Sequence, residues 1–172
     1  MEQILQLENR RDKNTTITIF LKLEEEQAYA EILVKGELDK FDFDDPQELE
    51  RKNELWKGTC FELFLANKKS SEYIELNLTP SLAWNLYHFE DIHKGMSEIS
   101  VEDKPFIESS KIGNRYRLRY RLNLENFTIN EETLFNATAI LLRRDNERTF
   151  WSALDLREKP DFHDKAYFLE ML

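Results

Sequence analysis

The segment NRYRLRYRLNL, residues 114–124, alternates apolar and basic side chains from Arg115 to Leu122. Successive side chains of a β-strand point to opposite faces of its sheet, so this period of two predicts a strand with one buried face. The expected core face carries Tyr116, Leu118, Tyr120 and Leu122, and the opposite face carries Arg115, Arg117, Arg119 and Arg121.

Two earlier segments show the same alternation. EYIELNLT, residues 72–79, separates the apolar row Ile74, Leu76 and Leu78 from Tyr73, Glu75 and Asn77. TCFELFLA, residues 59–66, places Cys60, Glu62 and Phe64 on one face. If the three segments share a sheet, its second face gathers Glu62, Glu75, Asn77 and the arginine row.

Further strands are expected at residues 16–23, 28–36, 82–89, 134–144, 149–153 and 166–172. A helix is expected from Asp45, its N-cap, through Pro46 and Glu48 to about Asn53. Connections are short and polar, and no linker or repeat divides the chain. The sequence predicts a single domain, residues 1–172, folded as an all-β, jelly-roll-like antiparallel β-sandwich with one short helix.

Composition narrows the function classes. The chain has a net charge of -10 and a pI near 4.9, which disfavours nucleic acid and anionic membranes as partners. A neutral small-molecule or sugar ligand is compatible with this charge. The lone Cys60 is expected to be a buried structural thiol, and the N-terminal segment has no apolar run of the kind that directs secretion, which predicts a cytoplasmic protein.

Aromatic and polar residues together suggest a sugar-binding face. Stacking on an indole and hydrogen bonds to carboxylates, amides and guanidinium groups are what a polyol needs. The candidate ligand-binding residues are Trp56, Glu62, Glu75, Asn77, Trp84, Arg119 and Trp151. The alternative is structural: the tryptophans pack in the core, and Glu62 pairs across strands with Arg119 or Arg121.

Other chemistries have weaker signals. Asp39, Asp42 and Asp44 carry oxygen ligands suited to Ca²⁺ but lack the spacing of an EF-hand loop, so no resident cofactor is expected. A haem could use His93 or His163 with Met96, and Glu62 with Glu75 could imitate a glycosidase pair. No glycine motif for a nucleophile or a phosphate is present, which favours a non-catalytic module.

Three stretches carry a family resemblance: LWKGTCFELFLA (55–66), YIELNLTPSLAWNLYHF (73–89) with Lys94-Gly95-Met96, and residues 151–163 ending in KPDFH. In them the chain resembles the DOMON-like domains related to family 9 carbohydrate-binding modules. The resemblance implies a jelly-roll-like sandwich in which two tryptophans clamp a terminal sugar.

Trp56 and Glu62 match the tryptophan-then-glutamate spacing of that motif, and Asn77 and Pro80 match its strand-ending part. Trp151 is then the candidate for the second ring, and Arg119 is assigned only by its face. Since some DOMON domains bind haem, a haem-binding redox domain is the alternative that this resemblance implies.

Overall fold

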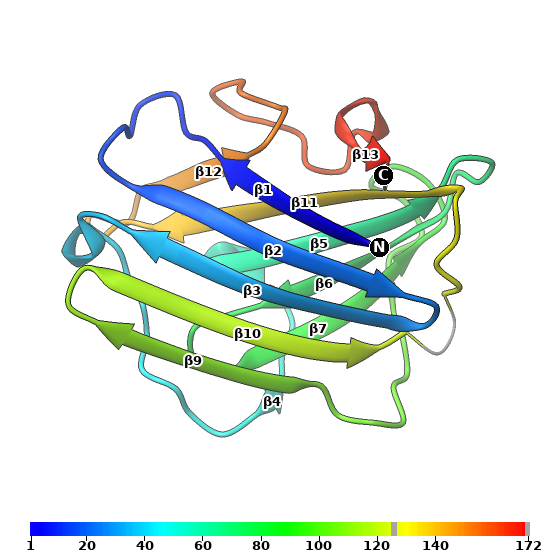
Figure 1. Cartoon of the computed structure of the whole chain (residues 1–172), viewed down its shortest axis with the longest axis horizontal. Helices are drawn as coiled ribbons and strands as arrows, with labels where there is room; N and C mark the ends of the chain where they lie inside the picture. The colour runs from blue at the N-terminus through cyan, green and yellow to red at the C-terminus, as the bar shows by residue number, and fades with distance from the viewer. Residues whose placement is uncertain (125–126, 171–172) are drawn as a thin grey trace.

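The computed structural model describes residues 1–124 and 127–170, and in them two β-sheets face each other (Figure 1). The first sheet is antiparallel throughout and lies in front in Figure 1. Its strands run in the order β1 (Glu2–Leu7), β2 (Thr16–Glu24), β3 (Gln27–Lys35), β10 (Arg115–Asn123) and β9 (Phe106–Ile112).

The second sheet is mixed, because β4 pairs with β7 in parallel. Its order is β12 (Arg148–Ser152), β11 (Thr133–Leu142), β5 (Cys60–Asn67), β6 (Tyr73–Leu78), β7 (Ala83–Phe89) and β4 (Glu50–Arg51). Two short strands extend it: β8 (Ser97–Glu98) pairs with β7, and β13 (Leu169–Glu170) pairs with β11. Three 3₁₀ turns complete the described residues: η1 (Leu38–Lys40), η2 (Leu55–Lys57) and η3 (Lys165–Tyr167).

The all-β sandwich expected from the alternation is confirmed. Apolar residues from the facing sides of both sheets form the main core. It contains every residue expected there from β6 and β10: Ile74, Leu76, Leu78, Tyr116, Leu118, Tyr120 and Leu122. Cys60 is fully buried as expected, and burial raises the pKa of its thiol well above the ordinary value. None of the described helical turns has the length and hydropathy needed to cross a membrane.

Replacing Leu76 by Ala is expected to lower the free energy of unfolding by about 2–5 kcal/mol, because Leu76 is buried between the sheets. Ile112, which is 79% exposed at the end of β9, supplies the matched control. Ile112→Ala should change stability by no more than about 0.5 kcal/mol. Urea unfolding followed by circular dichroism measures both values, and equal losses would contradict this placement of the core.

The expected helix over residues 45–53 is wrong. This stretch is irregular and mostly exposed, apart from the two-residue strand β4. Its sequence, DPQELERKN, contains one large apolar residue, Leu49, which packs against the core. One apolar residue forms no stripe, so a helix here would have no apolar face to bury.

Four strands of the described residues were not expected: the two-residue strands β4 and β8, and the longer strands β1 and β9. Each longer strand has few buried residues, which are Leu5 and Leu7 in β1 and Ile107 in β9. Of the strand expected at residues 166–172, the structure shows η3 followed by β13, and residues 171–172 lie outside the described part of the chain.

Candidate functional site

A row of polar side chains crosses the outer face of the second sheet. The antiparallel register places Thr138 of β11 opposite Glu62 of β5, Glu62 opposite Asn77 of β6, and Asn77 opposite Asn85 of β7. We call these four residues the polar row. Glu75 of β6 and Tyr87 of β7 face each other one step along the same face. All six side chains are buried.

The polar row is bonded at its two ends and open in its middle. Thr138 Oγ1 donates a hydrogen bond of 3.0 Å to Glu62 Oε2, and Arg51 Nε donates one of 2.8 Å to Asn85 Oδ1. Asn77 lies between them with an exposed fraction of 0%, and neither its amide nitrogen nor its amide oxygen has a partner among the residues that the structure describes. A buried amide without partners costs free energy, so Asn77 is poised to bond a polar group that enters beside it.

Trp56 lies over this face. It belongs to η2, which contacts β5, β6 and β7. The turn starts at Glu54, whose φ of 61° is left-handed. The Trp56 ring is half-buried and meets the Tyr87 ring edge-on, with the centroids 6.0 Å apart. A partly exposed indole therefore packs against Tyr87, whose hydroxyl group accepts a hydrogen bond from Asn85 of the polar row.

Both glutamates have raised pKa values. Burial raises the pKa of Glu75 to about 7, and burial together with the negative charge of Glu75 raises the pKa of Glu62 well above its ordinary value. The pair therefore keeps a proton to a higher pH than an exposed glutamate does. A protonated carboxyl group can donate as well as accept a hydrogen bond, which suits the hydroxyl groups of a polyol.

Aromatic side chains cover the other half of this face. The segment after β12 contributes Phe162 and Phe168, which pack with Phe64 and Tyr73. His163 from the same segment bonds the Tyr73 hydroxyl through Nδ1 at 2.7 Å. Burial lowers the pKa of His163 to about 4, so its ring is neutral at pH 7.

Two expected site tryptophans lie elsewhere, which is a correction to the sequence interpretation. Trp84 is 5% exposed and Trp151 is 1% exposed, and both belong to the core between the sheets. The reason is register. Trp151 pairs with Ala139 on the inner face, whereas its neighbour Phe150 pairs with Ile140 on the outer face. Trp151 is therefore not placed to act as the second ring of a clamp.

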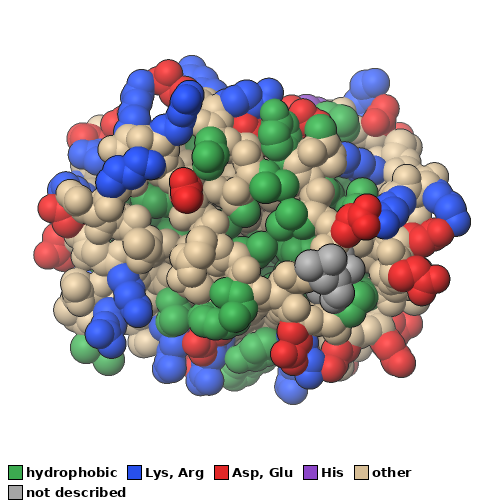
Figure 2. Space-filling model, turned by 45° about the horizontal axis from the view of Figure 1, so that its top comes forward, with side chains coloured by type: hydrophobic (Ala, Val, Ile, Leu, Met, Phe, Trp, Pro, Cys, Tyr) green, Lys and Arg blue, Asp and Glu red, His purple; other side chains and the backbone are tan. Residues whose placement is uncertain are grey.

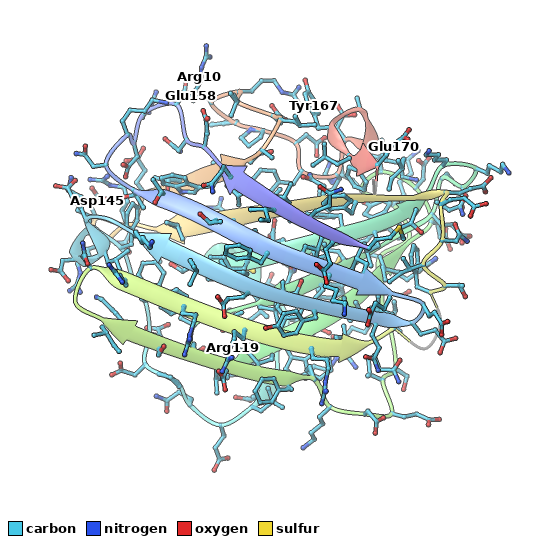
Figure 3. The ribbon with its side chains drawn as sticks, viewed as in Figure 1. Arg10, Arg119, Asp145, Glu158, Tyr167 and Glu170 are labelled. Atoms are coloured by element: carbon cyan, nitrogen blue, oxygen red, sulfur yellow. The ribbon has the colours of Figure 1, made fainter. Side chains whose placement is uncertain are left out.

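Arg119 also lies away from this site. Its strand, β10, belongs to the first sheet, so the arginine row does not share a face with Glu62. Arg119 pairs with Glu108 on the neighbouring strand β9, on the outer side of the sandwich opposite the polar row (Figure 3). This placement also removes Arg119 and Arg121 as cross-strand partners of Glu62.

The weaker candidates are scattered. Asp39 lies in η1 and contacts Lys111 at 3.4 Å. In residues 1–124 and 127–170, no three His, Cys, Asp or Glu side chains form a group that could hold a metal ion. His93 and His163 stack with centroids 4.2 Å apart, and His93 Nε2 lies 3.0 Å from Asp161, while Met96 is 45% exposed.

Asn85, Tyr87 and Thr138 are site residues that the sequence analysis did not select. A signal for Asn85 was present, since a core position of Trp84, the structural alternative for the tryptophans, puts the next residue on the opposite face. The signal for Thr138 was weaker, because its segment is apolar on both sides: ATAILL. Only the pairing of β11 with β5 aligns Thr138 with Glu62.

The site thus lies on one sheet face of a two-sheet, all-β sandwich. No protein-family model matches the sequence, and no curated protein matches it. Solved structures share the fold, among them the following three. A candidate carbohydrate-binding protein from Bacteroides uniformis matches with a TM-score of 0.63 and 14% identity, over 98% of this chain and 84% of that chain.

The other two are structures of a family 9 carbohydrate-binding module from Caldicellulosiruptor kristjanssonii. The complex with glucose has a TM-score of 0.57 and 13% identity, over 94% of this chain and 78% of that chain. The complex with cellotriose has a TM-score of 0.51 and 11% identity, over 97% and 77%. The relation to family 9 modules expected from the sequence is therefore confirmed at the level of the fold.

Proposed function

We propose that this protein is a non-catalytic module that binds a carbohydrate on the outer face of the second sheet. The observation that carries the proposal is the Asn77 amide. Among the described residues it is buried between Glu62 and Asn85 with an unused donor and an unused acceptor, and the half-buried Trp56 packs against Tyr87 on the same sheet face. A hydroxyl group both donates and accepts, so a polyol can satisfy both amide atoms at once.

In this proposal the apolar face of a sugar ring stacks on Trp56. Its hydroxyl groups reach toward Asn77 and Glu62, whose carboxyl group is already oriented by Thr138. The stacking supplies affinity, and the polar row fixes the orientation of the sugar. The fold shared with a module that was crystallised with glucose and with cellotriose supports a saccharide as the ligand class.

The shared fold supports binding over hydrolysis, because the solved structures that share it are a candidate carbohydrate-binding protein and a carbohydrate-binding module. A glycosidase would instead use Glu62 and Glu75 as an acid and a nucleophile or base.

Trp56→Ala is expected to weaken saccharide binding by about tenfold or more, because a stacked tryptophan is the type of contact that dominates small interfaces. The loss of stability should remain well below that of a core tryptophan, since the ring is only half-buried. A panel of neutral mono- and oligosaccharides, titrated by calorimetry, measures the affinity, and thermal melting measures stability.

Tyr29→Ala is the matched control, because Tyr29 is an exposed aromatic residue of the first sheet. It should bind like the unmodified chain. A second variant, Asn77→Leu, removes the unpartnered amide and should abolish binding while the fold stays intact. Saccharide binding that survives both Trp56→Ala and Asn77→Leu would show that the ligand binds elsewhere.

A further inference from the structure

A separate cleft opens beside Trp56. It has a volume of about 800 Å³ and lies between the β1–β2 loop, the β11–β12 hairpin and the segment after β12. Hydrogen bonds connect the segments that form its walls. Asn9 Nδ2 donates a 2.9 Å hydrogen bond to the Phe150 carbonyl oxygen, and Glu8 and Ser152 exchange backbone hydrogen bonds of 2.9 and 3.2 Å. The volume is within the range of small-molecule sites.

The charge of this cleft is opposite to that of the protein. Eight Lys or Arg side chains line it against three acidic ones, in a chain whose net charge is -10. Figure 2 shows Lys and Arg side chains gathered at the upper left of the molecule, and Figure 3 labels Arg10 and Glu158 at this end. We call it the basic cleft.

Half of these cations have no acidic partner. Arg11, Lys40, Arg143 and Arg157 each form an ion pair with a carboxylate. Among the residues that the structure describes, Arg10, Lys13, Arg148 and Lys159 have no carboxylate within ion-pair distance. All four are exposed. Concentrated positive charge without partners attracts an anionic ligand.

The basic cleft borders the proposed sugar site. Arg148 lies 5.9 Å over the Phe150 ring, and its Nη1 donates a 3.3 Å hydrogen bond to the Trp56 carbonyl oxygen. Phe150 lines the cleft and packs against the same aromatic cluster as Trp56. A saccharide seated on Trp56 would therefore extend past Arg148 into the basic cleft.

We infer that the basic cleft binds the carboxylate groups of an acidic saccharide, a chain containing uronic acid. This inference rests on the proposed function, because the saccharide is anchored at Trp56. Guanidinium and ammonium groups are the natural donors to carboxylates. A nucleic acid fits less well, since it needs an extended basic surface and the rest of this protein is acidic.

The test compares trimers of glucuronic and of galacturonic acid with their neutral methyl esters, by calorimetry at low and high salt. The acid form should bind the unmodified chain more tightly than its ester, and added salt should shrink the difference. Arg10→Ala with Lys159→Ala should weaken binding of the acid form by about tenfold and leave the ester unchanged. Lys104→Ala with Arg117→Ala, a distant exposed pair of the same composition, is the matched control.

Equal binding of acid and ester, or an advantage of the acid that survives Arg10→Ala with Lys159→Ala, would overturn the inference. If esters bind in a Trp56-dependent way while acids gain nothing, the inference fails and the proposed function stands. If neither form of any saccharide binds, both fail. A single-stranded oligonucleotide that binds through Arg10 and Lys159, where uronates do not, would assign the basic cleft to nucleic acid instead.

Discussion

Replacing Trp151 by Ala should lower the free energy of unfolding by about 3–5 kcal/mol, the largest stability loss expected for a single side chain of this protein. The indole is 1% exposed and packs between the sheets, and its Nε1 donates a 3.0 Å hydrogen bond to Thr149 Oγ1. Truncation would leave a large cavity and remove one hydrogen bond from the Thr149 hydroxyl group, which still donates to the Leu141 carbonyl oxygen. Urea unfolding measures the loss.

Trp56→Ala should instead cause a small loss of stability and a large loss of saccharide affinity, since that ring is half-buried and lies on the outer face. Trp151→Phe, which keeps most of the ring volume, should recover much of the stability lost in Trp151→Ala. Saccharide affinity, measured below the melting transition, should stay unchanged in Trp151→Phe and fall in Trp56→Ala. A binding loss in Trp151→Phe with little loss of stability would return Trp151 to the ligand site.

The alternation of side chains predicted the fold well because burial is a property of one strand at a time. The buried rows of β6 and β10 could be assigned from their own sequences, since a shift of one residue would expose every apolar side chain. The sheet that a strand joins cannot be assigned from the sequence of that strand alone. Nothing in the alternation of residues 114–124 states that β10 pairs with β3 and β9 rather than with β5 or β6. Arg119 was misplaced for this reason.

The site was predictable in part for the same physical reason. Glu62, Glu75 and Asn77 could be placed on one face because β5 and β6 follow each other and form a hairpin. Trp56 was placed near them because η2 leads directly into β5. Thr138 comes from β11, more than seventy residues later, so its contact with Glu62 depends on long-range pairing. The basic cleft likewise gathers residues from distant loops and had no local signal.

Glu75→Gln should change the pH dependence of stability by about 3 kcal/mol between pH 5 and pH 8. The pKa of Glu75 is raised from 4.5 to about 7 in the folded chain, chiefly by burial. Between these values the folded state keeps a proton that the unfolded state has lost. The stabilisation from this group is therefore fully present below about pH 4.5 and is lost as the pH rises through 7.

Glutamine removes this titration because its amide is neutral throughout. Relative to the unmodified chain, Glu75→Gln should be close in stability at pH 5 and more stable at pH 8. Chemical unfolding at pH steps across this range measures the difference. Glu102→Gln, in an exposed loop, is the control and should follow the unmodified chain. Parallel curves for Glu75→Gln would contradict a buried, protonated Glu75.

His163 lies 3.9 Å from Glu75, and its contribution to stability depends on pH in the opposite sense. The two contributions can therefore be measured separately. Burial lowers the pKa of His163 from 6.5 to about 4, so the unfolded state takes up a proton first. The stabilisation from a neutral His163 is present above about pH 6.5 and is lost as the pH falls through 4. His163→Gln should therefore differ in stability from the unmodified chain mainly below pH 6.5, whereas the difference for Glu75→Gln continues to grow up to pH 7.

If Glu75 contributes hydrogen bonds to a saccharide, Glu75→Gln should also bind the saccharide more weakly at pH 8. The same variant should be more stable than the unmodified chain at this pH. This combination is expected of a polar group that is buried for binding rather than for stability.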